Sequence, residues 1–143
     1  MKLNFSKIIF SVCFLFLLTN SCSNKCNVDN IEVSDLLGTV AKEKSINYCE
    51  LLEVALTGDE NAIKKLSLLE FDNSVGYEHG AVIVDLILVI GESEYIKAIS
   101  RTNGEQRNLI NTYLDVGLEY GNNSLVKEKD LKKAFPDLYF FLK

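Results

Sequence analysis

The chain has 143 residues and carries 20 acidic against 15 basic side chains, for a net charge of −5. Its length is that of one compact domain, and 48% hydrophobic content with a single proline excludes an intrinsically disordered or collagen-like chain. The excess of acid argues against non-specific nucleic-acid binding, which needs a basic surface. Composition therefore indicates a globular domain without indicating its chemistry.

The N-terminal 21 residues have the pattern of a secretory signal peptide. Lys2 and Lys7 supply positive charge before and at the start of a mostly apolar run over residues 8–18. As a helix this run would span about 16 Å, well short of the ~30 Å hydrocarbon core of a bilayer. The segment therefore predicts a signal cleaved after Ser21 rather than a permanent membrane helix.

A cysteine, Cys22, directly follows the apolar run and the small residue Ser21. This arrangement resembles the signal of bacterial lipoproteins, in which the cysteine is acylated and becomes the mature N-terminus. The resemblance implies that Cys22 is a lipid anchor, and Ser23 in place of an aspartate implies the outer membrane, facing the periplasm. The alternative is ordinary secretion with Cys22 as an unmodified cysteine.

The remaining cysteines bear on the compartment. Removal of residues 1–21 takes away Cys13, two lysines and no acid, which changes the net charge from −5 to −7. If Cys22 carries lipid, Cys26 and Cys49 remain as a candidate disulfide in an oxidising compartment, worth ~3 kcal/mol; the alternative is two free thiols. They lack the spacing of a metal site and His79 is the single histidine, so neither a metal nor a cofactor is predicted.

Residues 22–30 are polar and without periodicity, so they are expected to be a tether, and residues 31–143 a single helical domain. A short helix is expected within residues 31–44. Apolar side chains at positions 48, 51, 52, 55 and 56 then form the stripe of an amphipathic helix. Gly58 is expected to end this helix, and Asp59 to cap the next one, whose apolar residues lie between 62 and 69.

The second half of the chain continues the helical pattern. Residues 71–78 are expected to form a loop, and residues 81–90, nearly all apolar, a buried helix rather than a strand. Thr102 and Glu105 have the spacing of a capping box before a helix with apolar residues from 109 to 118. A further helix is expected over 127–135, ended by Pro136. An aromatic tail over 135–141 either closes the helical core or binds a partner.

An internal repeat gives the fold prediction. The segment from Gly58 aligns with the segment from Gly91, 33 residues later, and a fainter copy begins at Gly121. In each copy a glycine ends one helix in a left-handed conformation and a polar stretch begins the next. The pattern predicts an all-α fold of three stacked αα-hairpins, a short α-solenoid-like repeat; an irregular helical bundle is the alternative.

Candidates for chemistry are few. Tyr77, Glu78 and His79 lie in the expected loop, where His79 could act as a general base, although a histidine that helps the chain enter a buried helix is the simpler interpretation. Asp85 interrupts the apolar helix and is expected on its one solvated side. The chain has none of the common phosphate-binding, nucleophile or metalloprotease motifs, so it is not expected to be an enzyme.

The function expected from these features is that of an exported, lipid-anchored helical binding module. It would bind a protein partner, unidentified but with a basic surface, at the periplasmic side of the cell envelope. An immunity-type inhibitor of a basic toxin is one form of this expectation. The alternatives are a structural envelope-maintenance lipoprotein and an enzyme that uses the loop of Glu78 and His79.

Overall fold

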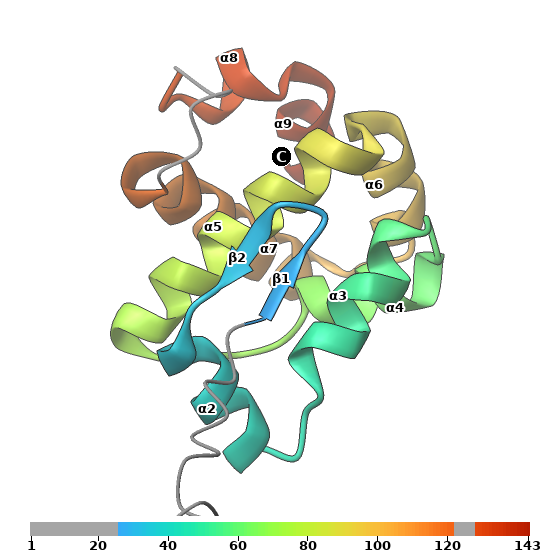
Figure 1. Cartoon of the computed structure of the whole chain (residues 1–143). Helices are drawn as coiled ribbons and strands as arrows, with labels where there is room; N and C mark the ends of the chain where they lie inside the picture. The colour runs from blue at the N-terminus through green and yellow to red at the C-terminus, as the bar shows by residue number, and fades with distance from the viewer. Residues whose placement is uncertain (1–25, 122–127) are drawn as a thin grey trace, which may run out of the picture.

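The structure, a computed structural model, describes residues 26–121 and 128–143 and is all-α apart from one small hairpin (Figure 1). The predicted fold class is therefore confirmed, whereas the predicted signal peptide and Cys22 lie outside the described residues. The elements in chain order are β1 (Cys26–Val28), β2 (Ile31–Val33), α2 (Asp35–Glu43), α3 (Tyr48–Leu56), α4 (Glu60–Ser67), α5 (Asn73–Ile90), α6 (Glu92–Ile99), α7 (Gly104–Tyr120), α8 (Leu131–Ala134) and α9 (Pro136–Leu142).

The N-terminal hairpin replaces part of the expected tether. β1 pairs with β2 in antiparallel register, with Cys26 opposite Val33. The two-residue turn between them has φ of 49° at Asp29 and 68° at Asn30, a conformation that these two residue types tolerate best after glycine. The prediction of a tether through residue 30 is thus wrong from Cys26 onward, because this turn chemistry and the buried side chains of β2 form a hairpin.

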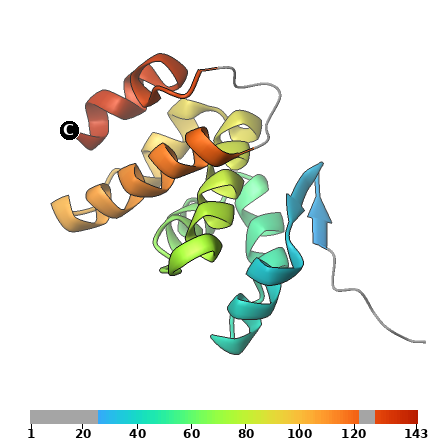
Figure 2. The same ribbon diagram turned by 90° about the vertical axis from the view of Figure 1, so that its left-hand side faces the viewer.

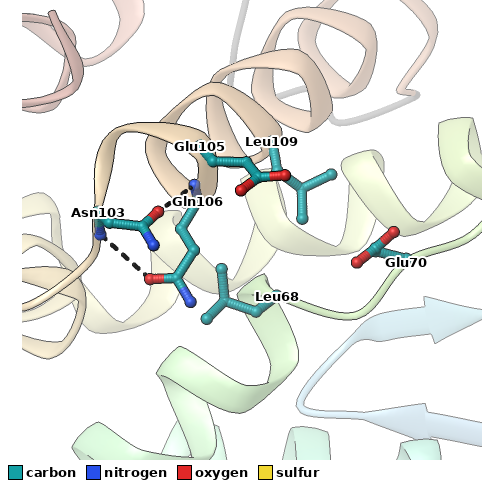
Figure 3. Close-up of a pocket in the computed structure, with 6 residues that line it drawn as sticks. All are labelled: Leu68, Glu70, Asn103, Glu105, Gln106 and Leu109. Carbon is teal, nitrogen blue, oxygen red and sulfur yellow. Dashed lines mark hydrogen bonds between the residues drawn. The ribbon is translucent and has the colours of Figure 1, made fainter.

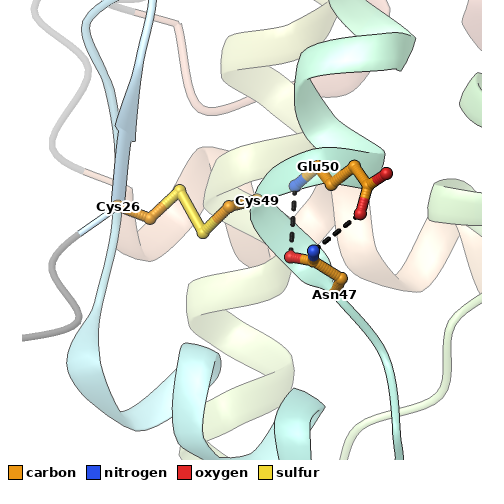
Figure 4. The surroundings of a disulfide bond; sticks show 4 residues. All are labelled: Cys26, Asn47, Cys49 and Glu50. Carbon is orange, nitrogen blue, oxygen red and sulfur yellow. Dashed lines mark hydrogen bonds between the residues drawn. A yellow bond between two sulfur atoms is a disulfide. The ribbon is translucent and has the colours of Figure 1, made fainter.

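A disulfide between Cys26 and Cys49 joins β1 to α3 (Figure 4). The two Cα atoms lie 6.1 Å apart. Asn47 caps α3 just before the bridge, since its side-chain oxygen accepts from the backbone N–H of Glu50 and its amide donates to the Glu50 carboxylate over 2.6 Å. The hairpin is therefore covalently attached to the first turn of a well-capped helix.

Two of the three expected helical hairpins are present. Gly58 and Gly91 have φ of +86° and +91°, which side chains other than glycine rarely adopt, and they join α3 to α4 and α5 to α6. Asp59 caps α4 as predicted, accepting from the N–H of Ala62 over 2.8 Å. The third copy differs, because Gly121 has φ of −68° and the residues after it, 122–127, lie outside the described part.

α5 and α7 form the centre of the fold and cross in direct backbone contact (Figure 2). A Cβ placed on Gly117 would lie 2.2 Å from the carbonyl oxygen of Gly80, and one placed on Gly80 would lie 2.4 Å from the carbonyl oxygen of Tyr113. Both distances are too short for a side chain, so glycine is required at both positions. α5 is long and apolar enough to span a membrane, yet half of it is buried within the fold, as in the central helix of a packed core.

The expected loop over residues 71–78 is wrong, because α5 already begins at Asn73. Gly76 and the polar residues around it are typical of a loop when taken from the sequence. In the structure Gly76 is a packing residue, since a Cβ there would lie 2.9 Å from the carbonyl oxygen of Phe71. The same Cβ would lie 3.6 Å from the Tyr113 ring, so the chain just before α5 and a side chain of α7 together leave room only for glycine, despite its poor helix propensity.

Two other helix boundaries differ from prediction. The capping box of α7 is built by Asn103 and Gln106, one residue later than expected, because the buried Thr102 hydroxyl donates instead to the carbonyl of Ile99 over 2.7 Å. The helix expected over 127–135 is limited to the single turn of α8 within the described residues. α8 ends before Pro136 as expected, but Pro136 also begins a second short helix, α9.

Candidate functional site

The predicted functional loop, Tyr77, Glu78 and His79, is one turn of α5. Consecutive residues of a helix point about 100° apart, so the three side chains project in three directions. Their side-chain partners lie on three different elements, with Tyr77 on α7, Glu78 at the start of α2 and His79 on α3. The structure therefore does not assemble these residues into one site.

His79 points into the core and is 0% exposed. Its Nδ1 lies 2.7 Å from the hydroxyl of Tyr48, and the rings of Phe71 and Tyr113 enclose it at centroid distances of 5.0 and 4.7 Å. Burial lowers the pKa of His79 to about 3, although the nearby carbonyl of Leu66 opposes this slightly. An enclosed, neutral imidazole holds Tyr48 in place but has no access to a substrate.

Glu78 has a structural partner 44 residues away. Its carboxylate accepts a hydrogen bond from the hydroxyl of Ser34, and the same hydroxyl oxygen accepts from the backbone N–H of Leu37 over 3.0 Å. Ser34 is the N-cap of α2, so Glu78 attaches the start of α2 to α5. A carboxylate used in this way is not available as the partner of a catalytic base.

Tyr77 lies on the surface and stacks on Tyr120 at the end of α7. The ring centroids are 5.1 Å apart with an interplanar angle of 19°, and the two residues are 47% and 63% exposed. The pair joins α5 to α7 at the protein surface, whereas Gly80 and Gly117 bring the same two helices together where their backbones cross. It is the outer edge of the same helix crossing.

A surface groove of about 340 Å³ lies between the α4–α5 connection and the first turns of α7 (Figure 3). It is a different place from the predicted loop. The α4–α5 connection contributes Leu68 and Glu70, and α7 with its N-cap contributes the rest of the lining, Asn103, Glu105, Gln106 and Leu109. The groove combines half-buried leucines with two exposed carboxylates, the exposed amide of Asn103 and the half-buried amide of Gln106.

The two carboxylates of the groove, Glu70 and Glu105, make no ion pair with any other residue that the structure describes. Lys44 approaches Glu70, but its ammonium donates to the backbone carbonyl over 2.9 Å and not to the carboxylate. The two acidic groups thus remain available to a cation from outside. They come from the two walls of the groove.

The amide side chains of the groove are held in place by the capping box. The Asn103 oxygen accepts from the N–H of Gln106 over 2.9 Å, and the Gln106 oxygen accepts from the N–H of Asn103 over 3.1 Å. Both amide oxygens are used, which leaves the amide nitrogens as donors. In Figure 3 the Gln106 nitrogen points toward Leu68.

The aromatic tail is buried in part and exposed in part. Phe135 and Leu138 are buried and close the end of the core against α6 and α7, whereas Phe140 is 66% exposed. The ammonium of Lys132 lies 5.8 Å from the Phe140 ring, within reach of a cation–π contact. Closure of the core therefore accounts for the buried half of the tail.

Sequence reasoning missed the groove. Its two walls are more than 30 residues apart in the chain, and each has a local explanation, the end of one helix and the cap of another.

Among the described residues no group of three or more histidine, cysteine or acidic side chains is arranged to hold a metal. Comparisons with protein-family models, with curated proteins and with solved structures find no match for this chain.

Proposed function

We propose that this protein is an exported, lipid-anchored binding module of the bacterial cell envelope. It recognises a protein partner by binding a basic surface on that partner. The observation that carries the proposal is the groove between the α4–α5 connection and α7, whose two carboxylates have no cation among the described residues. The net charge of −7 expected after signal cleavage favours the approach of a basic partner.

Glu78 and His79, the candidate catalytic residues, both make structural contacts in the fold. The imidazole of His79 is enclosed by aromatic rings and hydrogen-bonded to Tyr48, and Glu78 binds the N-cap of α2. A general base needs both access to substrate and a pKa near the working pH, and a buried imidazole with a pKa of about 3 has neither. These contacts support binding over catalysis.

The proposed location follows from Cys22. Acylation there would leave only residues 23–25 between the lipid and Cys26, so β1 would start within about 14 Å of the bilayer surface. In Figure 2 the hairpin and the N-terminal turn of α7 lie on opposite sides of the molecule. An outer-membrane anchor at Cys22 would therefore direct the groove away from the bilayer, toward the periplasm.

Two measurements test the proposal. Intact mass of the protein from its native membrane fraction should show a chain that begins at residue 22 and carries acyl chains, and Cys22→Ala should abolish both. A chain that starts at residue 22 without added mass would contradict the anchor.

The second measurement identifies the partner by crosslinking in intact cells followed by purification. The wild type and Glu53→Lys, a charge reversal on an exposed carboxylate of α3, should each crosslink one basic protein. The double variant Glu70→Lys/Glu105→Lys should not. A single toxin-like partner would favour the immunity-type form, and a stoichiometric set of envelope proteins would favour a structural lipoprotein. Equal crosslinking by all three proteins, or no partner at all, would contradict the proposed function.

A further inference from the structure

We infer that the groove accepts one arginine side chain of the partner together with a neighbouring backbone carbonyl. This inference rests on the proposed function and names the chemistry that the site would recognise. A groove of about 340 Å³ is at the small end of the range for ligand sites, which suits one long side chain and the peptide group beside it.

The apolar part of the groove fits the stem of a long basic side chain. Leu68 and Leu109 are half-buried and come from opposite walls, one after α4 and the other from α7. Arginine and lysine cover apolar surface with their methylene groups while the charged end stays in a polar environment. The two leucines therefore offer the surface that such a stem covers.

The charged part of the groove distinguishes arginine from lysine. Glu70 and Glu105 stand on different walls, so a cation between them can be approached by more than one carboxylate oxygen (Figure 3). The planar guanidinium has five N–H donors and pairs with carboxylates in a bidentate manner, whereas an ammonium is a compact and strongly hydrated charge. Arginine thus fits the pair of carboxylates better.

The amide part of the groove points to a polypeptide rather than to a free polyamine. The Asn103 and Gln106 oxygens are used by the capping box, and the amide nitrogens make no hydrogen bond with a described residue. N–H₂ donors repel a cation but bind a carbonyl oxygen. A peptide presents a cation and a carbonyl within one residue, and a polyamine presents no acceptor.

The test is a titration of the purified full chain, in mild detergent, with N-acetyl-arginine N-methylamide, followed by two-dimensional ¹⁵N NMR. We expect chemical-shift changes confined to residues 68–70 and 103–109. The citrulline analogue, which has nearly the same shape without the charge, should bind at least tenfold more weakly, and spermidine should bind more weakly than the arginine compound. Equal affinity for arginine and citrulline, or shifts elsewhere on the surface, would overturn the inference.

Matched variants assign the effect to the two carboxylates. Glu70→Gln/Glu105→Gln should lower the affinity for the arginine compound at least tenfold, while Glu53→Gln, an equivalent change on exposed α3, should not change it. Thermal unfolding of each variant shows whether the fold is intact, because Glu105 also stands in the first turn of α7. If the partner still crosslinks to the wild type but the arginine compound shows no preference, the inference fails and the proposed function stands.

Discussion

Acid should destabilise this protein through His79. Its pKa is about 3 in the fold and 6.5 in an unfolded chain, so the unfolded state takes up a proton that the folded state excludes. The stability that the neutral imidazole supplies is complete above pH 6.5 and is lost as the pH falls from 6.5 toward 3. By linkage, the loss is about 1 kcal/mol at pH 5.5, about 3 kcal/mol at pH 4.5, and about 5 kcal/mol in full.

The assay is urea unfolding followed by circular dichroism between pH 7.5 and 4.5, with the disulfide intact. The matched variant is His79→Gln, whose amide can still bind the Tyr48 hydroxyl but does not titrate. Its absolute stability will be lower because the aromatic cage is repacked, so the slopes are compared. Below pH 5.5 the free energy of unfolding of the wild type should fall more steeply than that of the variant, by about 1.4 kcal/mol per pH unit. Parallel curves would refute a buried neutral histidine.

Three further predictions concern stability. Gly117→Ala should lower the free energy of unfolding by about 1–3 kcal/mol or more, the cost of overpacking, because the added Cβ meets the α5 backbone. Gly38→Ala, which has open space around it in α2, should instead raise the free energy of unfolding by roughly 0.5–1 kcal/mol. Urea titrations of the two variants will show whether the signs differ. Cys49→Ser should remove about 2–4 kcal/mol, and a melting temperature that ignores reductant would contradict this. Ser34→Ala should cost about 1 kcal/mol, and Glu78→Ala should then add little, which a double-mutant cycle can measure.

The helices that could be predicted are those whose signals are local. The apolar spacing of α3, the glycines at 58 and 91, and the Asp59 cap all act within a few residues, and all are found in the structure. α5 was recognised only in its apolar half. Its first turns contain Gly76 and Gly80 because Phe71 and α7 pass too close to leave room for a side chain there. Helix propensity and apolar periodicity do not report such contacts.

The hairpin shows a local signal that was overlooked. Asp29 and Asn30, followed by the alternation of buried Ile31, exposed Glu32 and buried Val33, are typical of a two-residue turn and a strand. Each strand is only three residues long, and the hairpin is held by a disulfide to α3. A pair of strands this short is not stable without such support.

By itself the sequence determined the all-α class, the turns at Gly58 and Gly91 with the Asp59 cap, and the excess of negative charge, since these depend on neighbouring residues and on composition. Only the tertiary structure decided what His79 and Glu78 do and where the groove lies. Those features join residues 31 to 44 positions apart, and such contacts arise from the packing of helices against one another. A side chain's role is set by the partner that packing brings to it, and no local pattern specifies that partner.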